Sequence, residues 1–221
     1  MGLMSTYVRP EIESEVYRDP AGHVIDYGNR WGMSTAPEET YSIVTDPQRF
    51  HPLHDVANAL IDHVAANFDV TVHDDRSYAS DLLVESSDVV RAVRIVPHDP
   101  RSAAVTFVFT SFPGLKIHIG QVHDLSFPVC GCDACDDSWE LLTEEMEWHI
   151  LAVFDGGFSE DAGLLPRPWV SSRLQYAGGS TGGRVDAEDI PLERIRDAET
   201  VLATLDGRWA PWPPLIELSD R

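Results

Sequence analysis

Lysine is almost absent from this chain, and cysteine is scarce. Lys116 is the only lysine among 221 residues, and 37 acidic residues outnumber 16 basic ones, which gives a formal net charge of −21. A field of this sign repels phosphate backbones, so the composition excludes general nucleic-acid binding. It favours a basic protein partner. The alternative is that an aspartate-rich, lysine-poor composition serves only solubility.

Long apolar runs are also missing. No stretch approaches the roughly 18 apolar residues of a membrane-spanning helix, and the N-terminus runs into acidic sequence without an apolar signal region. We therefore expect a cytoplasmic protein without membrane contact. The hydrophobic fraction of 43% is enough for a core. We expect a single globular domain over residues 1–221, with 1–50 as an extended arm packed on it and 207–221 as an extended aromatic and proline-rich tail.

The hydrophobic pattern predicts an α+β fold. Apolar residues recur at three- and four-residue steps over 52–67, over 138–154 and after Pro191, as in helices with one buried face. Segments rich in β-branched and aromatic residues predict strands at 82–85, 89–96, 103–110, 115–122 and 169–176. Short turns between the first four predict an antiparallel meander. We expect an antiparallel sheet of about five strands packed against two or three helices.

A glycine-rich stretch covers residues 177–184, between the last predicted strand and the third helix. It lacks the Gly-Lys-Ser/Thr of a phosphate-binding loop, and its spacing does not match a dinucleotide fingerprint. We expect a flexible hairpin or a mobile loop there.

The three cysteines of the chain, Cys130, Cys132 and Cys135, fall within six residues around Gly131. In a reducing cytosol such a cluster is typical of metal binding or redox chemistry, and an odd count argues against a structural disulfide. Thiolates this close can converge on one soft cation, and a glycine supplies the backbone freedom of a tight turn. The spacing predicts a zinc-binding loop between a strand and a helix, with a structural Zn²⁺ ion.

A closed zinc site needs a fourth ligand, for which we predict His123. This histidine stands at the end of a predicted strand, seven residues before Cys130, so the chain can fold back onto it. The predicted metal ligands are therefore His123 and the three cysteines, as in other Cys₃His sites. The competing fourth ligands are Asp133, Asp136 and Asp137.

Two other interpretations of the cysteines stay open. Cys132 and Cys135 form a Cys-x-x-Cys pair just before a helix, where the helix dipole lowers a thiol pKa, as in redox motifs. The neighbouring aspartates oppose a free thiolate, and a bound divalent cation removes this objection. The second alternative is three unmetallated thiols in a turn.

The block His123–Asp136 resembles the signature of an uncharacterised actinobacterial family, a domain of unknown function. Its pattern is His-Asp-x(3)-Pro-x-Cys-Gly-Cys-Asp-x-Cys-Asp. Glu39–Thr45 and Gly207–Pro213 are similar to the same family. The resemblance covers nearly the whole chain. It implies a cytosolic protein of a GC-rich bacterium, and it brings no activity, substrate or catalytic residue.

Three functional hypotheses follow. The first is a zinc-stabilised, non-enzymatic protein that acts by binding another macromolecule. The second is a zinc- or thiol-dependent enzyme, which an open coordination position in a cleft would favour. The third is an acidic immunity-type or nucleic-acid-mimicking inhibitor, which a contiguous acidic surface without a cleft would favour.

Overall fold

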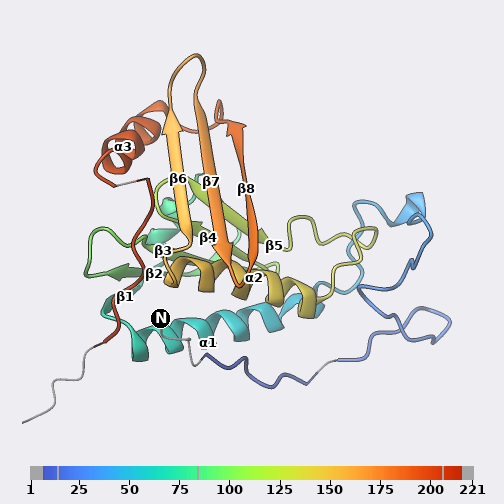
Figure 1. The fold of residues 1–221 in the computed structure, drawn as a ribbon. Helices are drawn as coiled ribbons and strands as arrows, with labels where there is room; N and C mark the ends of the chain where they lie inside the picture. Colours follow the sequence, from blue (N-terminus) through green and yellow to red (C-terminus); the bar gives the residue numbers. More distant parts are fainter. Residues whose placement is uncertain (1–6, 14, 84, 206, 216–221) are drawn as a thin grey trace, which may run out of the picture.

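The computed structural model describes residues 7–13, 15–83, 85–205 and 207–215. Its main sheet is an antiparallel meander in which each strand pairs with the next one in the chain (Figure 1). The five strands are β1 (Val70–Asp74), β2 (Val89–Pro97), β3 (Val105–Thr110), β4 (Leu115–Ile119) and β5 (His123–Phe127). The predicted α+β fold with an antiparallel five-stranded sheet is confirmed.

Two strand predictions were wrong in detail. The described residues of 82–85 form no strand, because Leu82 closes the short 3₁₀ helix η3 (Arg76–Asp81); residue 84 lies outside the described part. Neither β1 nor β5 was predicted, and the expected strand 169–176 belongs to a second sheet. The predicted strand 115–122 ends at Ile119, because Gly120 takes a φ of +66° that starts a turn. A Cβ at this position would collide with the Glu160 carboxylate.

The helices match their predictions. They are α1 (Pro52–Asn67), α2 (Trp139–Phe154) and α3 (Leu192–Leu202). The Ser138 hydroxyl caps α2 by accepting a hydrogen bond from the Leu141 amide. The apolar faces of α1 and α2 join the inner face of the main sheet in one buried core. No helix in the described part of the chain is long and apolar enough to cross a membrane.

A second sheet, which the sequence analysis did not predict, packs against α2. It consists of β6 (Phe158–Gly163), β7 (Trp169–Tyr176) and β8 (Gly179–Asp186), in that order. Only β7 was expected. The glycine-rich stretch forms the turn and most of β8, so the hairpin interpretation of this stretch is confirmed. Figure 1 shows this sheet standing on α2, on the side away from α1.

The described parts of the arm and of the tail both lie against the core. Near the start of the arm, the Arg9 guanidinium and the Tyr7 hydroxyl donate to the Glu147 carboxylate on α2. In the tail, Trp209 and Trp212 are buried. The Trp212 indole N–H donates to the Ala103 carbonyl. Residues 1–6 of the expected arm and 216–221 of the expected tail lie outside the described residues.

The buried Glu160 carboxylate joins the two sheets and the tail. It accepts hydrogen bonds from the amides of Gln121 and Val122, in the turn between β4 and β5, and from the Trp209 indole N–H. Burial raises the pKa of Glu160 from 4.5 to about 7, although the three donors oppose this shift. The fold therefore favours protonated Glu160 at mildly acidic pH.

Stability should consequently depend on pH through Glu160. Because the folded pKa lies above the unfolded one, its contribution is complete below about pH 4.5 and is lost as the pH rises through about 7. The difference between the folded and unfolded pKa values corresponds to roughly 3 kcal/mol of unfolding free energy. We expect the unfolding free energy of the wild type, relative to Glu160→Gln, to fall by about this amount between pH 4.5 and 8 in denaturant titrations. Parallel pH profiles for the two proteins would contradict this assignment.

Candidate metal centre

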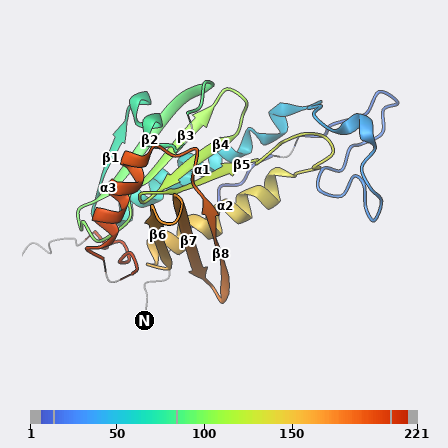
Figure 2. The same cartoon turned by 90° about the horizontal axis from the view of Figure 1, so that it is seen from above.

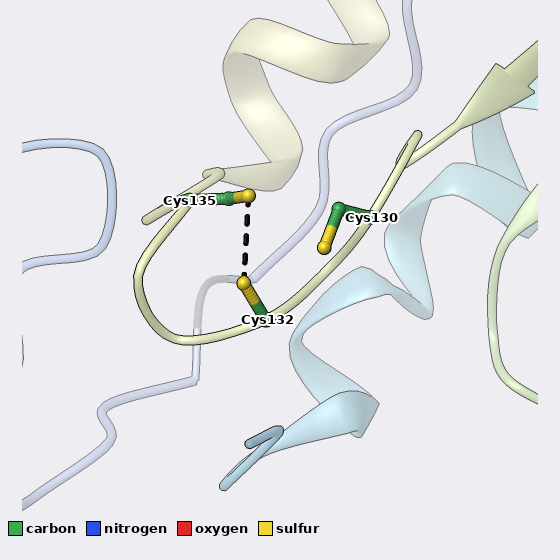
Figure 3. Close-up of side chains that lie close together, drawn as sticks. All are labelled: Cys130, Cys132 and Cys135. Atoms are coloured by element: carbon green, nitrogen blue, oxygen red, sulfur yellow. Dashed lines mark hydrogen bonds between the residues drawn. The ribbon is translucent and has the colours of Figure 1, made fainter. Parts of the chain in front are cut away.

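The three cysteine thiols converge in the loop between β5 and α2, as Figure 3 shows. Their Sγ atoms all lie within 4.8 Å of one another, and Cys132 Sγ lies 3.5 Å from Cys135 Sγ. Cys132 is buried, whereas Cys130 and Cys135 are exposed. Zinc–sulfur bonds of 2.3 Å at tetrahedral angles hold two sulfurs about 3.8 Å apart. The spacing of the thiols therefore fits one such ion with little movement.

The backbone of the loop explains this convergence. Gly131 has a φ of +76° and lies against the Phe112 ring, which a Cβ at this position would approach to 2.9 Å. Only glycine takes this turn without strain. The Cys135 amide then donates to the Cys132 carbonyl at 3.1 Å, which folds the second half of the loop back over the first. Ser138 follows as the cap of α2.

Cys132 and Cys135 differ in acidity because of the hydrogen bonds among the thiols. Burial raises the pKa of Cys132, but hydrogen bonds from the backbone of Cys135, the neighbouring thiols and the Ser42 amide bring it down to about 7. The pKa of Cys135 is raised to about 12 by burial and by its hydrogen bonds with Cys132 and Cys130. One sulfur is therefore ready to bind a cation near neutral pH, and the cation favours ionisation of the others.

The N-terminal arm wraps around the cysteine loop at one end of the molecule (Figures 1 and 2). The amides of Asp133 and Ala134 donate to the carbonyls of Ile43 and Thr40, at 2.7 and 3.1 Å. The Trp31 indole N–H donates to the Asp133 carbonyl at 3.1 Å. The loop backbone is thus held by a segment that precedes it by about 90 residues in the chain.

The Asp133 side chain fastens the arm to the loop. Its carboxylate is buried and accepts hydrogen bonds from the Thr45 amide and hydroxyl. Guanidinium nitrogens of Arg30 and Arg49 each lie 3.8 Å from one of its oxygens. Arg49 is itself buried and donates to the Gly131 carbonyl at 3.0 Å. Asp133, a competing ligand in the sequence analysis, is therefore engaged by the arm.

The structure does not bring His123 to the thiols. His123 is the first residue of β5, and the cysteine loop follows the last, so about 13 Å of strand separates them. Its ring packs instead against Phe158, with centroids 5.6 Å apart. Among the described residues, no histidine or carboxylate joins the three cysteines as a fourth close donor. The turn at Gly120 explains the difference, because it makes His123 the start of a strand instead of the end.

The other two aspartates have different surroundings. Asp136, directly after Cys135, has one oxygen that accepts from the Arg30 amide at 2.7 Å, while its other oxygen is buried without a hydrogen-bond partner. Asp137 is half-buried, and burial raises its pKa. Of the three competing aspartates, Asp136 is the one with a buried carboxylate oxygen that lacks a hydrogen-bond partner.

The basic residues of the site were not predicted from the sequence. Arg30 and Arg49 belong to the arm, and Arg49 contacts Gly131, 82 positions further along the chain. No spacing rule connects residues so far apart. The only available signal was indirect, because a loop with three aspartates and three thiols needs nearby positive charge.

Comparison with known families and proteins complements this geometry. The sequence model of a family of unknown function, DUF6226, matches residues 13–215. The chain belongs to this family. The match includes most of the arm, both sheets and the cysteine loop, and it confirms the resemblance to a domain of unknown function. No curated protein matches the chain, and no solved structure matches it.

Removing the Asp133 carboxylate should loosen the arm. Asp133→Ala leaves two arginines near the loop without their partner, which costs about 3 kcal/mol for a buried pair. We expect this loss of unfolding free energy in chelator-treated protein, together with faster proteolysis within residues 19–34. The matched control Asp137→Ala removes an aspartate of the same loop that makes no side-chain hydrogen bond in the described structure, and it should cost less than about 1 kcal/mol. Equal losses would refute the role of Asp133.

Proposed function

We propose that this DUF6226 member binds one Zn²⁺ ion through Cys130, Cys132 and Cys135, that the ion is structural, and that the protein acts in the cytoplasm by binding a basic protein partner. The observation that carries the metal proposal is the convergence of three thiols at zinc spacing. The alternative of a redox pair uses only two of the sulfurs and leaves the position of Cys130 unexplained.

Asp136 is our candidate for the fourth ligand. Its buried oxygen has no partner, and burying an unpaired carboxylate oxygen is unfavourable. The residue is next to Cys135, so closing the loop around an ion brings this oxygen toward the metal. Its other oxygen stays bonded to the Arg30 amide, which would orient the ligand as outer hydrogen bonds commonly do.

A structural role suits the surroundings of the cysteines better than a catalytic one. Neither the cavity beside His118 nor the larger one beside His123 is lined by a cysteine. The ion would compensate charge in a loop that carries three thiols and three aspartates. It would also fix the segment to which the arm is bonded. Structural zinc supplies folding energy of this kind where a loop has little core of its own.

The proposed partner surface consists of the arm and loop around the cysteines. Ile43 and Val129 are exposed by 51% and 89%, and Tyr41 is exposed by 54%. Ile43 is bonded through its backbone to the loop, and Val129 immediately precedes Cys130. Exposed apolar side chains on an acidic protein suit a partner segment that is apolar and basic, because opposite charge speeds encounter and apolar contact holds the complex.

Metal content and thiol reactivity test the first part of the proposal. We expect one zinc per chain by elemental analysis, slow reaction of the thiols with a colorimetric reagent, and fast reaction after chelation. Chelation and Cys132→Ser should each lower the melting temperature by roughly 5–10 °C, since an ion at 100 times its Kd adds about 2.7 kcal/mol. Reloading chelated protein with zinc is the control. Rapid reaction of two thiols in untreated protein, or a reversible Cys132–Cys135 disulfide, would instead support the redox alternative.

Capture of partners from the lysate of the source organism tests the second part. We expect a basic protein that, once identified and purified, binds the zinc-loaded protein and loses at least tenfold in affinity with Val129→Asp or Ile43→Asp. Binding should also weaken with added salt, which screens exposed charges over about 10 Å at 0.1 M. Val8→Asp, an equally apolar and exposed site near the start of the arm, is the control. Binding unaffected by Val129→Asp and Ile43→Asp would contradict the proposed surface.

A further inference from the structure

A cavity of about 400 Å³ lies away from the cysteine loop, between the edge strand β5, the helix α2 and the small sheet. His123, Asp124 and Leu125 of β5 line one side, and His149 of α2 lines another. Residues of β7 and β8 line most of the rest, together with Leu83, Val122 and Ile190. Both ribbon views place these elements next to one another (Figures 1 and 2). The volume falls within the range of small-molecule sites in proteins.

The walls of this cavity are mainly apolar and carry no positive charge. Leu125, Val170, Leu174 and Ile190 supply apolar surface, and no lysine or arginine lines the cavity. Asp124 is the one charged residue among the lining residues. Its carboxylate is already engaged, since one oxygen accepts from the His118 ring at 2.7 Å and the other from the Leu83 amide at 2.8 Å. Such walls disfavour an anionic ligand, because nothing in them offsets the negative charge.

His123 lines the cavity and carries an unsatisfied polar atom. Its Nε2 is buried and has no hydrogen-bond partner among the described residues. Stacking near Phe158 holds the ring in place, with centroids 5.6 Å apart. Burial, with smaller effects from His149 and other neighbours, lowers the pKa of His123 to about 4, so the imidazole is neutral at pH 7. Buried polar groups of this kind are normally bonded, which leaves a ligand or a bound water to complete the site.

We propose that this cavity binds a neutral small molecule with an apolar body and one hydroxyl group, which forms a hydrogen bond with His123 Nε2. A hydroxyl both donates and accepts, so it satisfies this nitrogen in either tautomer of the neutral ring. The apolar body replaces water against the side chains of β5, α2 and β7. The serines of β7, Ser171 and Ser172, lie at the same cavity and offer further hydroxyls for orientation.

Three matched probes of similar size test this assignment on the full chain at pH 7: 2-naphthol, naphthalene and naphthalene-2-carboxylate. In fluorescence titration we expect 2-naphthol to bind with one-to-one stoichiometry and the carboxylate to bind at least tenfold more weakly. His123→Phe keeps an aromatic ring but removes the nitrogen. This variant should bind 2-naphthol at least tenfold more weakly than the wild type does. Its affinity for naphthalene should be unchanged or higher. His51→Phe, an exposed histidine that does not line the cavity, is the control and should change nothing.

A second variant keeps the test decisive if His123→Phe does not fold. Ser172→Trp on β7 fills the cavity without replacing the histidine, and it should abolish 2-naphthol binding while the melting temperature shows a folded protein. Zinc-loaded and chelated protein should bind the probe equally, since the cavity is separate from the cysteines. No binding of 2-naphthol, equal binding of the carboxylate, unchanged affinity in His123→Phe, or binding that persists in Ser172→Trp would each overturn the proposal.

Discussion

The attachment of the N-terminal arm to the cysteine loop through Asp133 is the interaction on which the shape of the proposed metal site depends. A buried carboxylate requires compensation, and here two arginines and a threonine of the arm provide it. One of these arginines, Arg49, also donates a hydrogen bond to the Gly131 carbonyl. It therefore holds both the Asp133 side chain and the backbone of the cysteine loop. Without the arm, a loop of this composition would have few partners to define it.

The attachment also places scarce positive charge beside the cysteine loop. The protein carries a net charge of −21 with few basic residues, yet two of its arginines are placed at the cysteine loop. Arg49 is buried there between the Tyr27 and Phe50 rings, each 4.2 Å from its guanidinium carbon. Two arginines are thus placed where three thiols and three aspartates lie close together in the chain. A divalent cation would complete the same compensation.

Periodicity and local spacing predicted much of the fold. Helices α1 and α2 follow from apolar stripes that bury one face, and the convergence of Cys130, Cys132 and Cys135 follows from their separation of a few residues. The strand β6 was missed because its Ser-Glu-Asp centre is polar in sequence, whereas Glu160 is in fact buried and bonded. The position of His123 was misjudged because the turn at Gly120 depends on contact with Glu160, 40 positions away.

The strand β5 carries the two proposed sites at opposite ends. Its first residue, His123, faces the cavity beside α2, and its last residue leads into the cysteine loop. This arrangement would separate the proposed metal from the proposed small-molecule site, so that each could be occupied independently. It also explains why a histidine close to the cysteines in sequence is distant from them in space.

We have proposed that three thiolates and one carboxylate oxygen hold a zinc ion. X-ray absorption spectroscopy at the zinc edge of the purified protein tests it most directly. We expect three sulfurs at about 2.3 Å and one oxygen at about 2.0–2.2 Å from the zinc. Fewer than three sulfurs, or the scattering pattern of a bound imidazole, would contradict it.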